Sequence, residues 1–150
     1  WCVVEEHGKA VFLAKAVSGR SIRTNARVGQ HVPLYRLAAG KAILANLPKD
    51  RQATILGRYE FPLGDTEIIR SEFEEELERI REDGTAFVSE QFIHGVAGVA
   101  APILDTSNSV YGAICVSGPD ARLSGNRLET EVADLVRGVA GEIRVNISHN

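Results

Sequence analysis

Two stretches at the start of the chain, residues 1–5 and 10–17, are rich in β-branched and aromatic residues. The polar break between them, at residues 6–8, ends in a glycine and is a turn signal, so the pattern predicts a β-hairpin. The more polar stretch 20–25 is a candidate third strand. Gly29 to Pro33 is rich in turn-forming residues and is expected to form a loop.

Helix-forming residues dominate the next part of the chain. Residues 37–46 are strong helix formers apart from Gly40, so they predict one helix. A second, short helix is expected to begin at Pro48, a favourable first-turn residue, and to end at Gly57. Residues 58–65 are expected to be irregular.

A third helix has a sharp sequence signature. Ser71 and Glu74 form an S-x-x-E pattern, which is typical of a capping box at a helix start. Gly84 supplies the expected end of this helix. One apolar face follows from the spacing of Phe73, Leu77 and Ile80. The acidic run from Glu72 to Glu78 is interpreted as the solvated face of the same helix rather than a metal or protein site.

The last third of the chain returns to strand patterns. Residues 85–93, 96–104 and 109–118 predict three strands, with a turn at 105–108. A long amphipathic helix is predicted by the apolar positions Leu128, Val132, Leu135, Val139, Ile143 and Ile147. Hairpins outnumber strand–helix–strand units, so we expect one α+β domain over residues 1–150, an antiparallel sheet with helices packed on it.

Composition narrows the possible functions. The 150 residues carry a net charge of −3, and the densest basic run spreads three arginines over residues 20–27. Direct nucleic-acid binding is therefore not expected. The two cysteines form no disulfide framework and no zinc-ligand spacing, which predicts a reducing, cytoplasmic setting and no metal. No membrane span or signal peptide is expected, and a chain that begins at Trp1 without any methionine is expected to be a piece of a longer protein.

Two glycine motifs and one cysteine are candidate features of a nucleotide-binding or catalytic site. The Gly40-Lys41 pair lacks the other residues of a phosphate-binding loop, and close packing of a helix on the sheet explains Gly40 better. Gly95-x-x-Gly98 is too short for a dinucleotide fingerprint and is typical of a bulge or a close approach to a strand. Nothing in the sequence orients His94 toward Cys115, so a Cys/His enzyme is not favoured.

Small side chains on two predicted strands indicate space above the sheet. On one face, residues 96–104 carry Val96, Gly98 and Ala100, and residues 109–118 carry Tyr111, Ala113, Cys115 and Ser117. Either a closely packed helix or a small ligand could fill that space, with Cys115 and Ser117 as polar groups for a ligand. The helix beginning at residue 37 would present the free amides of Ala38, Ala39 and Gly40, which favour an anion such as a carboxylate.

These segments resemble the effector-binding domain of the IclR family of transcription regulators. The resemblance rests on residues 28–34 and 39–45, on Leu77, Ile80, Arg81 and Gly84, on Glu90 with residues 95–103, and on residues 113–119 with Arg122 and Leu123. It implies a GAF-like fold with a curved antiparallel sheet flanked by helices. It also implies an N-terminal winged helix-turn-helix domain outside this chain that binds DNA, a homodimer or homotetramer, and a small organic acid as effector.

The resemblance also implies which residues form the effector pocket. The implied residues are Ser21, Thr24, Val32, Ala38, Ala39, Gly40, Val88, Val96, Gly98, Cys115 and Ser117. A regular strand would place Ser21 and Thr24 on opposite faces, so the strand bends or one of them lies elsewhere. Val88 stands where some members carry an Asp, and Cys115 replaces a serine. These departures make the expected pocket less polar, so we expect a carboxylate with an apolar or aromatic body.

Three functions therefore remain in competition. The favoured one is the ligand-sensing, non-enzymatic domain of an IclR-type repressor or activator, with no cofactor. A GAF-like enzyme that uses Cys115 requires an accessible thiolate with a lowered pKa. A ligand-free dimerisation module requires a filled pocket.

Overall fold

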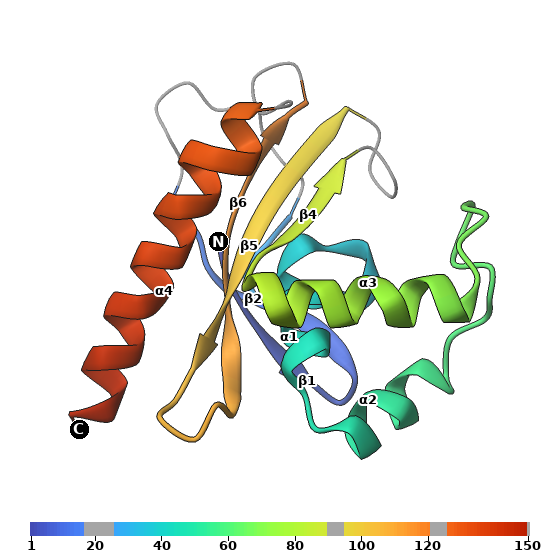
Figure 1. Ribbon diagram of the computed structural model, residues 1–150. Coiled ribbons are helices and arrows are strands. Elements are labelled where there is room, and N and C mark those ends of the chain that lie inside the picture. Colours follow the sequence, from blue (N-terminus) through green and yellow to red (C-terminus); the bar gives the residue numbers. More distant parts are fainter. Residues whose placement is uncertain (17–25, 90–94, 121–125, 150) are drawn as a thin grey trace.

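Six antiparallel strands form one curved sheet in the computed structural model, which describes residues 1–16, 26–89, 95–120 and 126–149 (Figure 1). The strand order is β3-β2-β1-β6-β5-β4. The strands are β1 (Cys2–Glu6), β2 (Lys9–Ala14), β3 (His31–Pro33), β4 (Ala86–Ser89), β5 (Val96–Leu104) and β6 (Val110–Pro119). The predicted α+β class is confirmed.

Helices cover both faces of this sheet. On one face lie α1 (Ala38–Asn46), which follows the 3-10 turn η1 (Leu34–Arg36), and α3 (Arg70–Asp83); α2 (Lys49–Leu56) connects to them at the lower edge of the view. On the opposite face lies α4 (Ala133–Ser148), preceded by the π-helical turn η2 (Leu128–Val132) (Figure 1). None of the described helices is long and apolar enough to cross a membrane.

The two faces of the sheet contribute to two separate hydrophobic cores. Ala100 and Cys115 belong to the core beneath α1 and α3, together with Phe73 and Leu77 of α3. Val99 belongs to the core beneath α4. Side chains alternate between the faces of a strand, so the small residues of β5 and β6 fall on the faces that the sequence predicted.

Most predicted elements are confirmed, but the predicted loop at Gly29–Pro33 is wrong. The predicted loop at Gly29–Pro33 contains the short edge strand β3, because His31 and Val32 pair with Val11 and Ala10 of β2. The pairing supplies backbone hydrogen bonds that outweigh the local turn signals. The candidate strand at 20–25 lies outside the described residues.

The predicted capping box at the start of α3 is also wrong by residue. Its N-cap is Ile69, and the Glu72 carboxylate accepts a hydrogen bond from the Ile69 amide at 3.3 Å. Ser71 therefore lies within the first turn. The predicted end is confirmed, since Gly84 has a left-handed φ of 75° and donates its amide proton to the Ile80 carbonyl at 2.9 Å.

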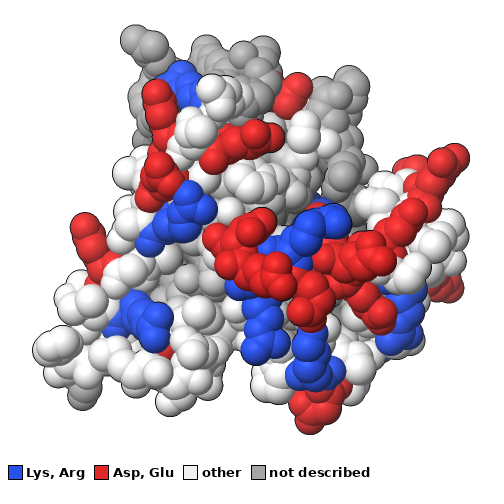
Figure 2. Space-filling model, viewed as in Figure 1, with Lys and Arg blue, Asp and Glu red and all other residues white. Residues whose placement is uncertain are grey.

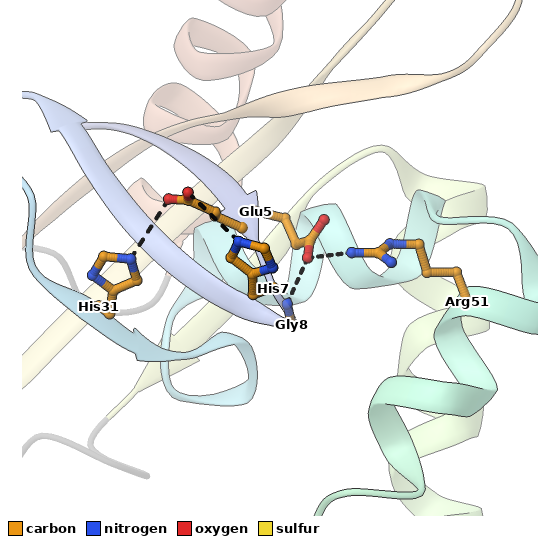
Figure 3. A network of polar contacts seen from close by, with 6 residues as sticks. Glu5, His7, Gly8, His31 and Arg51 are labelled. Atoms are coloured by element: carbon orange, nitrogen blue, oxygen red, sulfur yellow. Dashed lines mark hydrogen bonds and ion pairs between the residues drawn. The ribbon is translucent and has the colours of Figure 1, made fainter.

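Polar contacts fix the tip of the β1–β2 hairpin against α2 (Figure 3). The Glu5 carboxylate, whose side chain is 14% exposed, accepts hydrogen bonds from the Gly8 amide at 2.7 Å and from Arg51 at 2.5 Å. The Glu6 carboxylate lies 3.6 Å from His31 Nε2. The residues at the tip form no cluster of His, Cys, Asp and Glu suited to a metal, and the described chain contains no such cluster elsewhere.

Candidate functional site

A row of predicted site residues crosses three strands near the C-terminal end of β6. Gly98 of β5 pairs with Ser117 of β6 on one side and with Val88 of β4 on the other. In the adjacent row, Ala100 pairs with Cys115. Predicted site residues of three strands are thus direct neighbours across the sheet.

The first residue of α1 lies directly above this row. A methyl group built at Gly98 would lie 3.8 Å from Ala38 Cβ and 3.5 Å from Ser117 Cβ. Both distances are ordinary van der Waals contacts, so glycine at position 98 leaves a space of about one methyl group between the helix start and the sheet. Farther along the helix, Ala39 and Ala42 pack in the same core as Ala100 and Cys115, so α1 itself fills the space above that second row.

The start of α1 lacks a cap of its own. Its N-cap is Leu37, whose side chain accepts no hydrogen bond, and the first turn contains no acidic residue. The first helical bond at this end runs from the Lys41 amide to the Leu37 carbonyl at 2.9 Å. The preceding amides, those of Ala38 to Gly40, point out of the helix end, where the helix dipole adds partial positive charge. An anion at this end would satisfy both features.

Burial separates the predicted site residues into two groups. Ala38, Ala39, Gly40, Val88, Gly98 and Cys115 are buried, whereas Ser117 is exposed and Val96 is half-buried. Val96 pairs with Pro119 at the open end of the same face. Whether these residues contact a ligand stays a prediction.

Three further residues belong to the predicted pocket. Ser21 and Thr24 lie outside the described residues. Val32 lies in the edge strand β3, which β2 and β1 separate from β6, and it packs against the margin of the core. In the described part of the chain, the site is formed by α1 and strands β4 to β6.

Gly40 packs closely against the turn that precedes α1. A Cβ atom at this position would lie 2.0 Å from the carbonyl oxygen of Leu34, in η1. The close packing predicted for Gly40 exists, but its partner is the preceding turn and not the sheet. The turn and the helix start therefore form one rigid corner above Gly98.

A buried ion pair anchors the same helix to α3, and sequence reasoning missed it. The side chain of Lys41 is fully buried, and its ammonium donates to Glu76 at 2.7 Å. The interpretation of residues 72–78 as a solvated face is wrong at Glu76, whose side chain is 23% exposed. A charged residue inside the apolar run of α1 was the available signal, because a buried ammonium requires a partner.

The chemistry of Cys115 does not favour an enzyme. Burial raises the pKa of the Cys115 thiol to about 11, whereas a nucleophilic cysteine needs a lowered pKa. The backbone amide of Cys115 donates to the Trp1 carbonyl at 3.0 Å, so the residue is part of the sheet. It is a small core residue beneath α1.

We expect Cys115 to react with a thiol reagent far more slowly than the denatured chain at pH 8. At that pH, a pKa of about 11 leaves roughly one thiolate in a thousand, and burial hinders access further. The measurement is Ellman labelling of a Cys2→Ser variant, with and without urea. Labelling of the folded variant as fast as that of the denatured one would contradict the buried assignment.

Comparison with known families assigns the class of this curved sheet with helices on both faces, which is a regulator's effector-binding domain. Residues 3–145 match the model of the family described as bacterial transcriptional regulator IclR C-terminal. The chain belongs to this family. The resemblance seen in the sequence is confirmed.

Curated relatives are regulators rather than enzymes. The chain is 35% identical over 122 residues to the HTH-type transcriptional regulator Rv1719 of Mycobacterium tuberculosis, covering 81% of this chain and 47% of the relative. It is 31% identical to the HTH-type transcriptional repressor AllR of Salmonella typhi, covering 93% of this chain and 52% of AllR. The chain thus spans about half the length of these relatives. The relatives that this chain matches are thus transcription regulators, as the resemblance implied.

Solved structures share the fold. The Thermotoga maritima IclR structure superposes with a TM-score of 0.87 at 28% identity, covering 97% of this chain and 59% of that one. The inducer binding domain of the Acinetobacter transcription factor PobR, solved with 3-hydroxybenzoic acid, superposes with a TM-score of 0.82 at 23% identity, covering 95% and 85% of the two chains.

Proposed function

We propose that this chain senses a small organic carboxylate and thereby modulates DNA binding by a longer protein. The carboxylate would lie at the uncapped start of α1 and accept hydrogen bonds from the amides of Ala38 to Gly40 and from the Ser117 hydroxyl. The observation that carries the proposal is the position of this helix start directly above Gly98 and Ser117. An anion there gains both hydrogen bonds and the helix dipole.

The apolar surroundings indicate the body of the ligand. Val88 and Gly98 add no charge or hydrogen-bonding side chain, and Cys115 is a weak donor beneath the helix. We therefore propose an apolar or aromatic carboxylate. The PobR inducer binding domain, which shares this fold, holds 3-hydroxybenzoic acid, a ligand of that class.

The proposed assembly is the one that the resemblance to the IclR family implies. Residues 1–150 would form the effector domain, and a winged helix-turn-helix domain preceding it would bind DNA in the cytoplasm. The full protein would be a homodimer or homotetramer. The ligand would act by binding two arrangements of the protein with different affinities, since equal affinity would shift nothing.

We expect aromatic carboxylates to raise the melting temperature of this chain. At a ligand concentration 100 times Kd, binding adds about 2.7 kcal/mol, which corresponds to a shift of roughly 5–10 °C for this size. The measurement is a thermal-shift series with benzoate, 3-hydroxybenzoate, gluconate and pyruvate, with benzamide as the uncharged match for benzoate.

Single-residue variants test whether the carboxylate that raises the melting temperature binds at the start of α1. Ser117→Ala and Ala39→Asp should reduce the shift, the second because it places a negative charge at the helix start. Ser107→Ala, in the turn at the far end of β5, is the matched control and should leave the shift unchanged. No shift with any acid would overturn the proposal in favour of a dimerisation module. A shift with pyruvate alone would overturn the apolar ligand class.

A further inference from the structure

A cavity lies outside the candidate effector site, along α3 and the edge strand β4. Its volume is about 410 Å³, and it is open to solvent. Three carboxylates, those of Glu72, Glu76 and Asp83, line it together with the apolar side chains of Ile80 and Phe87. None of these residues takes part in the proposed carboxylate site.

Negative charge exceeds positive charge along this cavity. The carboxylates follow one stripe of α3, and Figure 2 shows acidic side chains gathered over this helix. Lys41 neutralises Glu76 from the protein side, and Arg79 is the one basic residue in the cavity lining. Glu72 and Asp83 therefore outnumber Arg79, which forms no ion pair with the described residues.

A nearly buried threonine also lines the cavity. Thr85 is 4% exposed, and its side chain makes no hydrogen bond to the described part of the chain. Polar side chains buried to this degree almost always have a partner. Thr85 lies between Asp83 and Phe87 in sequence, so a hydroxyl acceptor, a carboxylate and an aromatic ring line the same end of the cavity.

We propose that this cavity binds an organic ammonium compound with an apolar or aromatic body. The ammonium would donate hydrogen bonds to the Asp83 carboxylate and to the Thr85 hydroxyl oxygen. The body would contact Ile80 and the Phe87 ring, whose face attracts cations. A metal ion is not the ligand, because the described acidic residues form no group suited to one.

This cavity would bind a cation, whereas the proposed effector site would bind an anion. The two sites are nevertheless connected through α1. Glu76 lines the cavity and also holds Lys41 of α1, the helix whose start forms the carboxylate site. A cation in the cavity would therefore act on the same helix through Glu76 and Lys41, about one turn from the helix start. The ammonium site does not depend on the proposed carboxylate site, so each can fail alone.

The test is an NMR titration of the ¹⁵N-labelled 150-residue chain with benzylamine, using benzyl alcohol as the uncharged match. We expect saturable shifts at the amides of Thr85 and Phe87, a Kd of about 1 mM, and at least about tenfold weaker binding of benzyl alcohol. The absence of saturable shifts up to about 10 mM benzylamine would overturn the proposal, as would saturable shifts confined to other residues.

Matched variants separate the cavity from the general charge of α3. Asp83→Asn and Thr85→Val should each weaken benzylamine binding at least about fivefold. Glu82→Gln removes the same charge from the same turn of α3 but lies outside the cavity lining, so the Kd should stay within about twofold of the parent value. Equal weakening by Glu82→Gln and Asp83→Asn would overturn a defined site, because a diffuse surface effect would then explain the binding.

Discussion

Gly40→Ala is expected to lower the free energy of unfolding by about 3 kcal/mol or more. The added Cβ would lie 2.0 Å from the Leu34 carbonyl oxygen and 2.7 Å from Leu34 Cα. Both atoms belong to backbone, so relief requires the turn η1 and the start of α1 to separate. Urea denaturation of the parent and variant chains, followed by circular dichroism, measures the difference.

A matched control comes from α4. A Cβ at Gly141 meets nothing within 4 Å, so Gly141→Ala should raise the free energy of unfolding by about 0.5–1 kcal/mol through helix propensity. The two substitutions are chemically identical and differ only in their surroundings. If both variants were equally stable, the rigid corner formed by Leu34 and Gly40 would not exist as described.

Glu76→Gln is expected to lower the free energy of unfolding by about 2 kcal/mol, because it replaces the charged carboxylate that accepts a hydrogen bond from the buried Lys41 ammonium with a neutral amide. Lys41→Met removes the buried charge itself and leaves Glu76, which is 23% exposed, able to reach water. Its effect should be smaller, about 1 kcal/mol. The double variant should lose less stability than the sum of the single variants.

The control for this pair lies on the same helix. Glu74 pairs with Arg70, and both side chains are 47% exposed, so Glu74→Gln should change stability by less than about 0.5 kcal/mol. Chemical denaturation of all four variants gives the comparison. Equal losses for Glu74→Gln and Glu76→Gln would show that the Lys41 contact adds nothing beyond a surface pair.

Sequence periodicity located the helices and the long strands because each of them has one face in a core. Phe73, Leu77 and Ile80 face the core beneath α3 as their spacing predicted. The short strand β3 escaped this reasoning because three residues carry too little pattern. The capping residue of α3 was misassigned because Glu72 and Glu74 are both placed to reach a backbone amide, and only the path of the chain before Ile69 decides between them.

Parts of the candidate site were predictable for the same reason. Alternation along strands placed Gly98 and Ser117 on one face, and the structure makes them neighbours. The contact between Lys41 and Glu76 joins residues 35 positions apart, so no local pattern could have paired them. Gly40 was marked as a packing residue, but its neighbour depends on the turn at Leu34, whose conformation no periodicity predicts.

The central sheet separates two independent cores, and this separation bears on how such domains diversify. Gly98 and Ala100 face α1, whereas Val99 and Ala101 face α4. Substitutions in the first set of residues can therefore change the face beneath α1 without disturbing the packing of α4. The sheet thereby separates the face that carries the candidate site from the face that packs against α4. Over evolution, residues on one face can change while those on the other stay the same.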